Sequence, residues 1–471
     1  MKHVFGASTY VKPPWKSQQF HMPKRKMQAR IKRQDQRAKR NVEMSRLKAF
    51  RSLDIRVQVA ILIALFVALS VFLHSQHVSA DLFAVYLAAM NYGAGDLSSI
   101  YHNPNPAFSL STPPGWPQQA VDLGVFGRQL YPFIYPPIWA ALLAPLPHWI
   151  SPQSFEMAAF VINPALMGIC AVLAYRIMQP KMDLVLWMVL SLGFVVSTSF
   201  GHVALGQNQP QILVSTLILF ALERSRYGKD IAAGSLLALA AAIKIYPAVF
   251  AIIWLATRNC RAFGTFCMVG GSLAGLSVFL TGWPLHQEFL DLIRTIANSF
   301  LTCPICWNVD ATIAQWYLSD FLAESAARPD ALEIEKIAFT VKPERIQILD
   351  KISFLTALAL LFLAATRASD VRIYRAIWPA MMIAVAMFSP LTWSYHYLSV
   401  VFFLPIIAET YGSRGWAAFF ALIAALNPWT AWLLFKVPSP YMVGQLVGTL
   451  CVILIFVLFL WNKDDSQATP P

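Results

Sequence analysis

Long apolar runs recur along most of the chain and indicate its fold class. The first covers 57–73, with Gln58 as its one strongly polar member, and its length suits a bilayer core about 30 Å thick. Eleven further runs follow, at 133–150, 155–175, 184–200, 209–222, 231–256, 262–281, 352–366, 373–389, 397–410, 415–435 and 440–461. The pattern predicts an all-α polytopic membrane protein, with about 12 transmembrane helices in a domain over 57–461.

Two long polar stretches interrupt this regularity, at 76–132 and 282–350. The first is rich in proline and glycine, and the second holds most of the acidic residues of the second half of the chain. Span counting from the N-terminus places both stretches on the exterior. The sequence therefore predicts two long exterior loops.

The formal charge of +13 is carried by the first 56 residues. They hold 16 Lys and Arg against three acidic residues, whereas the remaining 415 residues carry 21 of each sign. Such a tail (1–56) is expected to stay solvated and to be attracted to anionic head groups. By the positive-inside rule it places the N-terminus in the cytoplasm, and span parity places the C-terminal tail 462–471 there too. Translation from Met22, Met27 or Met44 is an alternative origin of the tail.

The charges of the other loops agree with the span count only in part. Basic residues that the count places inside are Arg258, Arg261, Arg367, Arg372, Arg375, Arg414 and Lys463. Basic residues that it places outside are Arg176, Lys181, Arg224, Arg226 and Lys229. Two explanations stay open: either the middle spans are miscounted, for example through a re-entrant half-helix broken at Pro247, or these charges act at the outer surface.

Composition and motifs disfavour several classes of protein. With 57% hydrophobic and 13% charged residues, the chain is too apolar for a soluble globule. Basic character confined to a tail disfavours a nucleic-acid enzyme. The absence of a P-loop and of a Gly-x-Ser-x-Gly elbow disfavours an ATP-driven pump and a serine hydrolase. Cys303 and Cys306 have no second ligand pair nearby, which favours an exterior disulfide or two idle thiols over a zinc site.

Charged side chains inside or beside the apolar runs are candidate functional groups, because each is costly to insert into lipid. Asp81 follows the first run. It is either part of the N-terminal cap of a short helix over 82–91 or a catalytic base at the membrane surface. Lys244 lies deep within the 231–256 run, three residues before Pro247, which favours an anion-binding role over a structural one.

Two polar breaks add further candidates. Gln207 and Asn208 lie in an amide-rich segment between apolar runs, which is either a plain turn or a place where amides bond a sugar. Trp393 and His396 lie three apart at an exterior helix junction, and on one helix face they suit sugar stacking and phosphate contact. An interfacial aromatic belt is the alternative there, and it accounts for Trp393 better than for His396.

In chain order these features resemble glycosyltransferase family 87, which comprises polytopic C-type glycosyltransferases and includes polyprenyl-phosphate-mannose-dependent mannosyltransferases. The residues that carry the resemblance, over roughly 57–460, are Asp81, Tyr86, Tyr101, Phe133–Pro137, Gly206–Asn208, Gly234, Lys244–Pro247 and Ser389–His396. The basic tail and the Cys303/Cys306 pair are not part of that pattern. The resemblance implies the C-type glycosyltransferase fold.

The resemblance also implies an inverting transfer of a sugar, with mannose expected, from a polyprenyl-phosphate-linked donor. The acceptor is a hydroxyl of a cell-envelope glycan or glycolipid at the outer membrane face. Asp81 is the expected base, and Lys244 and His396 are expected to meet the donor phosphate. The residues expected to orient donor or acceptor are Tyr135, Gln207, Asn208 and Trp393. No metal and no further cofactor is expected, because the sequence lacks a dense carboxylate cluster.

Two other classes of protein compete with this hypothesis. A transporter or flippase of lipid-linked glycans would share the spans and the buried cation, but it needs neither a base at the outer lip nor long exterior loops. A non-catalytic partner of a glycan-assembly complex would tolerate the loss of Asp81. The enzyme hypothesis places the protein in the inner (plasma) membrane, with lipid-borne substrates and no nucleic acid. Asp81→Asn separates the three.

Overall fold

The computed structural model describes residues 52–75, 79–101, 112–125, 130–318, 338–428 and 440–461. The basic tail up to residue 51 and the C-terminal tail 462–471 lie outside the described residues. The chain divides into two compact parts, Met1–Gln58 and Val59–Pro471. In the first part, Asp54 Oδ1 accepts the Arg56 backbone N–H at 2.7 Å, beside the start of α2.

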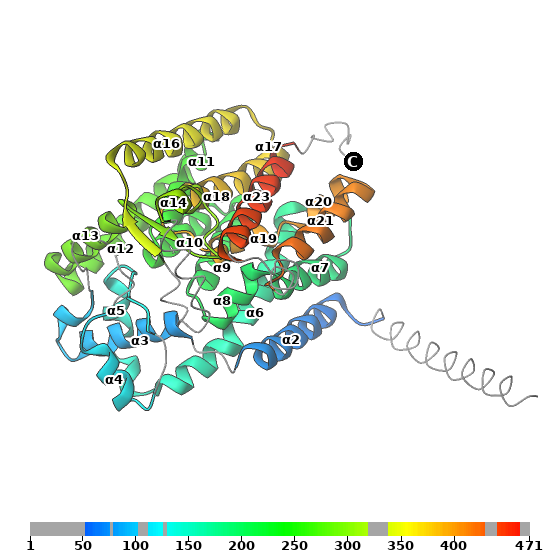
Figure 1. The fold of residues 1–471 in the computed structure, drawn as a ribbon. Helices are drawn as coiled ribbons and strands as arrows, with labels where there is room; N and C mark the ends of the chain where they lie inside the picture. The colour runs from blue at the N-terminus through cyan, green and yellow to red at the C-terminus, as the bar shows by residue number, and fades with distance from the viewer. Residues whose placement is uncertain are drawn as a thin grey trace, which may run out of the picture. The chain divides into compact units, whose positions relative to one another are not determined.

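The described residues are mostly helical (Figure 1). The helices of the first half are α2 (Ile55–His74), α3 (Ala80–Gly93), α4 (Trp116–Asp122), α5 (Ile138–Leu143), α6 (Pro152–Met178), α7 (Leu184–Ser197), α8 (Ser199–Gly206), α9 (Gln211–Arg226), α10 (Asp230–Ile243), α11 (Ala251–Ala256) and α12 (Cys260–Thr281). Those of the second half are α13 (Trp283–Ala297), α14 (Val309–Tyr317), α16 (Glu344–Arg367), α17 (Asp370–Arg372), α18 (Trp378–Met387), α19 (Leu398–Val401), α20 (Pro405–Thr410), α21 (Gly412–Leu426) and α23 (Pro440–Leu460). Strands β1 (Ser299–Thr302) and β2 (Ala338–Val341) pair antiparallel. The predicted helical class is confirmed apart from this small sheet.

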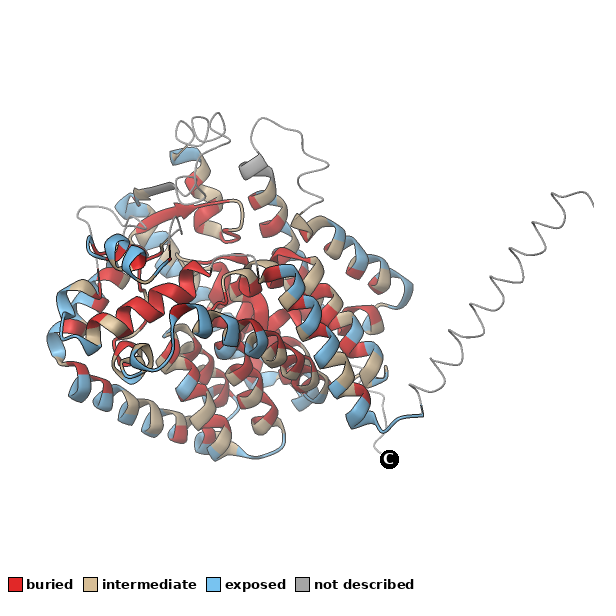
Figure 2. Ribbon diagram, turned by 90° about the horizontal axis from the view of Figure 1, so that it is seen from below, coloured by how far each residue is buried: buried red, intermediate tan, exposed pale blue. Residues whose placement is uncertain are grey.

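Four of the described helices are long and apolar enough to cross a membrane, namely α2, α6, α12 and α16. A fifth candidate is α7 with α8, joined at a bend of 70°. In α12 and α16 only 11% and 17% of the apolar stretch is buried, so most of each helix offers apolar side chains to lipid. Figure 2 shows that exposed and half-buried positions alternate with buried ones along the outer helices. The structure supports membrane character, but it does not confirm a count of about 12 spans.

The apolar run at 133–150 does not form a membrane-length helix. It starts without regular secondary structure, continues as α5 and ends in a 3₁₀ turn, Leu146–His148. The six residues of α5 rise about 9 Å, far less than a bilayer core. Several prolines interrupt the run, and each removes a backbone donor and restricts the residue before it. The structure therefore gives no support to a span at this position.

The run at 231–256 folds back on itself. α10 ends just before Lys244, which is extended at φ −137° and ψ 134°. The chain then returns through a 3₁₀ segment, Tyr246–Phe250, and α11. Asn259 Nδ2 donates to Asp230 Oδ1 at 2.8 Å and joins the two ends of this hairpin. Lys244 lies at the tip of a helical hairpin, which corrects its predicted place inside a continuous helix.

The basic loops that the span count left unexplained gather at one end of the helices. We define the basic end as 176–183, 223–230, 257–261, 367–375 and 409–414. Arg226 Nη2 donates to Gln179 Oε1 at 2.8 Å, and Arg375 Nη2 donates to Gln179 O at 2.6 Å. Glu409 Oε2 accepts the Lys181 backbone N–H at 2.7 Å. Loops predicted to lie on opposite sides of the membrane are therefore neighbours.

The polar breaks gather at the other end of the same helices. We define the site end as 79–81, 206–210, 303–308 and 389–396. The backbone N–H of Ser79 donates to Glu156 Oε1 at 2.9 Å, near the start of α6. Near the end of α6, Arg176 pairs with Glu223 of α9 at 2.7 Å. Both α6 and α9 thus begin at the site end and finish at the basic end.

Small residues allow two close approaches that shape this bundle. A Cβ at Gly234 of α10 would lie 2.5 Å from the carbonyl oxygen of Ala262 on α12. A Cβ at Gly201 would lie 2.3 Å from the carbonyl oxygen of Val195, inside the bend between α7 and α8. Glycine lets helix backbones meet at such distances.

Candidate active site

The turn between α8 and α9 aims three consecutive amides in different directions. Asn208 has a left-handed backbone with φ 45°, a conformation that asparagine tolerates better than most residues. The Gln209 backbone N–H bonds back to Ala204 O at 2.9 Å and closes the turn. Gln207, Asn208 and Gln209 consequently reach different partners.

Gln207 and Asn208 hold the start of α3. Gln207 Oε1 accepts the Ala80 backbone N–H at 3.0 Å, and Asn208 Nδ2 donates to Ser79 Oγ at 2.9 Å. Asn208 Oδ1 accepts a further hydrogen bond from Asn163 Nδ2 at 3.0 Å. Two amides predicted to orient substrate therefore have protein partners, and their contacts are those of a scaffold that fixes the residues before Asp81.

Asp81 lies in the first turn of α3, so the helix predicted over 82–91 is present and begins two residues earlier. The side chain is 6% exposed, and its Oδ2 accepts a hydrogen bond from Gln209 Nε2. Burial raises the pKa of the Asp81 carboxyl to about 7, against the opposing effects of the Lys244 charge and the Gln209 hydrogen bond. A carboxyl with a pKa near the working pH suits general base catalysis.

Tyr135 connects Asp81 to a cluster of side chains that also contains Lys244, Tyr395, His396 and Trp393. Its hydroxyl donates to Gln209 Oε1 at 3.5 Å, and its backbone carbonyl accepts the Tyr101 hydroxyl at 2.6 Å. Its ring lies 5.6 Å from Lys244 Nζ. Tyr135 thus lies between the carboxyl and the cation, and its role in orienting substrate stays a prediction.

Lys244 is held by aromatic rings and an imidazole. Besides Tyr135, the ring of Tyr395 lies 5.3 Å from Nζ, within the range of a cation–π interaction. His396 Nε2 lies 3.5 Å from Nζ. Within the described residues, Lys244 forms no ion pair with a carboxylate.

His396 lies beside Lys244, and its ring is neutral. His396 Nδ1 lies 3.0 Å from the Trp393 backbone nitrogen and 3.3 Å from the Trp393 carbonyl oxygen, while Nε2 lies 3.5 Å from Lys244 Nζ, which can only donate. Burial, and after it the charge of Lys244, lower the pKa of His396 well below its usual range. An ammonium and a neutral imidazole therefore lie side by side, and the ammonium is suited to bind an anionic oxygen.

Trp393 is buried beneath aromatic neighbours and does not lie in an interfacial belt. It is 5% exposed, and the rings of Tyr395 and Tyr131 lie 5.5 and 6.5 Å from it. Its indole Nε1 is buried and has no hydrogen-bond partner among the described residues. Buried indole N–H groups usually find an acceptor, and a bound hydroxyl or phosphate oxygen would supply one here.

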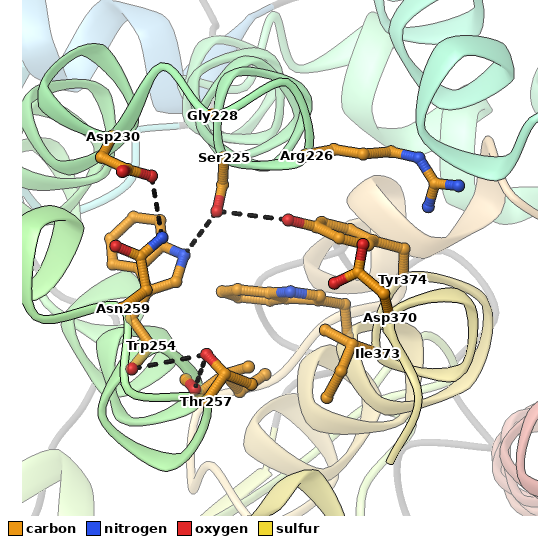
Figure 3. Close-up of a pocket in the computed structure, with 12 residues that line it drawn as sticks. Ser225, Arg226, Gly228, Asp230, Trp254, Thr257, Asn259, Asp370, Ile373 and Tyr374 are labelled. Carbon is orange, nitrogen blue, oxygen red and sulfur yellow. Dashed lines mark hydrogen bonds between the residues drawn. The ribbon is translucent and has the colours of Figure 1, made fainter.

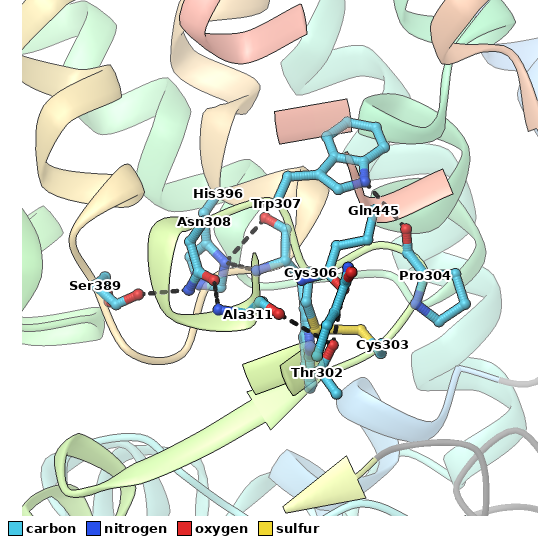
Figure 4. Close-up of a disulfide and its surroundings, with 12 residues drawn as sticks. Thr302, Cys303, Pro304, Cys306, Trp307, Asn308, Ala311, Ser389, His396 and Gln445 are labelled. Atoms are coloured by element: carbon cyan, nitrogen blue, oxygen red, sulfur yellow. Dashed lines mark hydrogen bonds between the residues drawn. A yellow bond between two sulfur atoms is a disulfide. The ribbon is translucent and has the colours of Figure 1, made fainter. Parts of the chain in front are cut away.

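A disulfide-closed turn supports the segment that carries Trp393 and His396. Cys303 and Cys306 are bonded, and the turn between them receives the Ser394 backbone N–H on Ile305 O at 2.8 Å. In Figure 4 the residues after the turn reach toward this segment, where Asn308 Nδ2 donates to Ser389 O at 2.7 Å. The disulfide left open by the sequence is present and braces the site end.

A separate cavity of about 300 Å³ lies at the basic end, away from Asp81. Figure 3 shows the hydroxyl of Ser225 between Trp254 and Tyr374, both of which donate to it, at 2.9 and 3.3 Å. The Arg226 guanidinium lies 4.8 Å from the centre of the Tyr374 ring. These contacts tie the end of α9 to the segment Ile373–Ile377, just before α18, and hold the partly buried Arg226 against Tyr374.

Sequence similarity adds an independent observation to this geometry. Residues 133–316 match the model of glycosyltransferase family 87. The resemblance is thereby confirmed over about two fifths of the chain. No curated protein matches the chain. The family 87 match supports glycosyltransferase activity, with a donor and an acceptor, in a membrane.

The family 87 segment holds part of the cluster. Tyr135, the three amides of the turn and Lys244 lie inside it, whereas Asp81 precedes it and His396 follows it. Asp81 and His396 join the segment through Gln209 and Lys244. Within the described residues no three His, Cys, Asp or Glu side chains gather closely enough to hold a metal ion.

Two residues of the cluster were not among the predicted site residues. Gln209 belongs to the amide-rich segment, but sequence does not tell which of three amides turns inward. Tyr395 lies within the Ser389–His396 segment that carries the resemblance but was given no role in the site, and its ring lies 4.7 Å from that of His396. A signal for Tyr395 was available, since it directly precedes the histidine in a proline-flanked break.

Proposed function

We propose that this protein transfers a sugar, mannose in the first instance, from a polyprenyl-phosphate donor to a hydroxyl of a cell-envelope glycan or glycolipid, with inversion. The observation that carries the proposal is one cluster that joins a buried carboxyl to a cation and a neighbouring imidazole. Asp81 reaches Tyr135 through Gln209, and Tyr135 lies beside Lys244 and His396.

In this proposal Asp81 takes the proton from the acceptor hydroxyl as its oxygen attacks the anomeric carbon. The bond between that carbon and the phosphate oxygen breaks, and the lipid leaves as a monophosphate with one further negative charge. Lys244 and His396 meet the phosphate, where this charge grows. Trp393 offers its unpartnered indole N–H to the sugar or the phosphate.

Loop charges and contacts together support an active site on the exterior. If 133–150 does not cross and 231–256 is a re-entrant hairpin, the predicted 12 spans become about 10 crossings, and the two termini stay on one side. The basic end then faces the cytoplasm with every basic loop that had been unexplained, as the positive-inside rule requires. The site end faces outward, where a lipid-borne donor is needed because nucleotide sugars are absent.

The test is transfer of radiolabelled mannose from polyprenyl phosphate to a glycolipid acceptor by the full chain in nanodiscs. Asp81→Asn cannot accept a proton, so turnover should fall by about 10²–10⁴-fold with donor binding retained. Lys244→Ala removes a charge that meets the phosphate before and during transfer, so donor KM should rise and kcat fall.

Matched controls are Asp122→Asn at the exposed end of α4 and Lys351→Ala on an exposed face of α16, both expected to transfer like wild type. Wild-type transfer by Asp81→Asn would remove the base from the mechanism. Movement of a fluorescent lipid-linked sugar across liposomes by Asp81→Asn, with no transfer by wild type, would favour the flippase.

A further inference from the structure

Gln209 is the one described residue that bonds the Asp81 carboxyl through its side chain. It is 1% exposed, and its amide spans two partners, with Nε2 on Asp81 Oδ2 and Oε1 on the Tyr135 hydroxyl. A carboxylate only accepts and the tyrosine hydroxyl donates to an oxygen, so these partners fix which way the amide faces. Asp81 Oδ1 receives no hydrogen bond from a described residue.

Hydrogen bonds join the segment before Gln209 to the start of α3. The two predecessors of Gln209 bond the residues just before Asp81, Gln207 to Ala80 and Asn208 to Ser79. These two hydrogen bonds tie the turn to the first turn of α3. The side-chain amide of Gln209 is thereby placed to donate to Asp81 Oδ2, which leaves Asp81 Oδ1 for the acceptor hydroxyl.

We propose that Gln209 is a positioning residue for the base: it orients the Asp81 carboxyl and stabilises its ionised form in a buried place. The inference rests on the proposed function, because it assigns Gln209 a task in that same reaction. The three amides of the turn then have two tasks: Gln207 and Asn208 hold the start of α3, and Gln209 bonds the Asp81 carboxyl.

Gln209→Leu keeps the bulk of the side chain and removes the donor. Without that hydrogen bond the Asp81 pKa rises above about 7, because burial is opposed by Lys244 alone. A rise of about one unit lowers the ionised fraction at pH 7 about fivefold and leaves it nearly unchanged at pH 9. Donor KM should stay close to wild type, since the contacts of Lys244 and His396 are untouched.

The experiment measures kcat and donor KM from pH 5.5 to 9 for the full chain in nanodiscs. In Gln209→Leu the pH at which kcat falls to half on the acidic side should be about one pH unit higher than in wild type. Gln211→Leu is the matched control, because that neighbouring amide bonds Tyr246 at 2.5 Å and not Asp81, so this pH should stay as in wild type. An unchanged pH of half-maximal kcat in Gln209→Leu, or an equal shift in Gln211→Leu, would overturn the proposal.

Infrared spectra of the Asp81 carboxyl supply a readout that does not depend on transfer. At pH 8 the protonated C=O band that disappears in Asp81→Asn should be stronger in Gln209→Leu than in wild type. Equal bands would sink the positioning role even if transfer is real. A stronger band together with wild-type transfer by Asp81→Asn would keep the contact and reject the proposed function.

Discussion

Asp81 shows how a single buried carboxyl couples activity to stability. Its folded pKa of about 7 exceeds the ordinary 3.8, so the folded protein holds this proton more tightly than the unfolded chain. The contribution of this bound proton to the free energy of unfolding is complete below about pH 3.8 and is lost as the pH rises through about 7. Asp81→Asn removes this loss, so the variant should melt about a few degrees above wild type at pH 8.

Thermal unfolding of detergent-purified protein at pH 5 and pH 8 measures this effect. The difference between Asp81→Asn and wild type should be larger at pH 8, whereas the exposed Asp122→Asn should show none at either pH. A difference in melting temperature that is the same at both pH values would mean that ionisation of Asp81 does not destabilise the folded protein.

The sequence identified Asp81, Lys244 and His396 because charges in apolar surroundings are conspicuous, and the structure brings them together. It missed Gln209, whose direction depends on the left-handed backbone of Asn208.

At the scale of elements, the contact between α10 and α12 controls where Lys244 lies. A Cβ at Gly234 would lie 2.5 Å from the backbone of Ala262 and 2.8 Å from that of Phe266, so Gly234→Ala must push the helices apart. We expect a loss of about 1–3 kcal/mol, measured by thermal or denaturant unfolding. Gly264→Ala on α12 meets nothing within 4 Å and should unfold like wild type. Equal stability of the two variants would show that the contact is loose.

Hydropathy located these helices well where a run is long and uninterrupted, as in α2, α6, α12 and α16. It failed where two short helices share one apolar run, as in 231–256, because apolar composition does not show where the chain reverses its direction. The extended backbone of Lys244 and Pro247 in the following turn mark that reversal. At 133–150 proline shortened the helix while the residues stayed apolar.

At the scale of the whole molecule, two topologies make opposite predictions for three loops. Twelve straight spans place residue 149 inside and residues 181 and 229 outside. The contacts of the basic end and the site end, read with about 10 crossings, reverse all three. Single cysteines at Trp149, Lys181 and Lys229, each exposed in the structure, distinguish the two topologies in the full chain. The four free cysteines are first replaced by alanine, and the Cys303–Cys306 disulfide is kept.

A membrane-impermeant maleimide added to intact cells should label Trp149→Cys and should reach Lys181→Cys and Lys229→Cys only after permeabilisation. Labelling of both lysine positions from outside would restore the 12-span order and put the basic charges at the outer surface. The proposed reaction depends on this result, because α9 runs from the turn that holds Gln209 to the basic end. If Lys229 is cytoplasmic, that turn and Asp81 face the side where a lipid-linked sugar is the available donor.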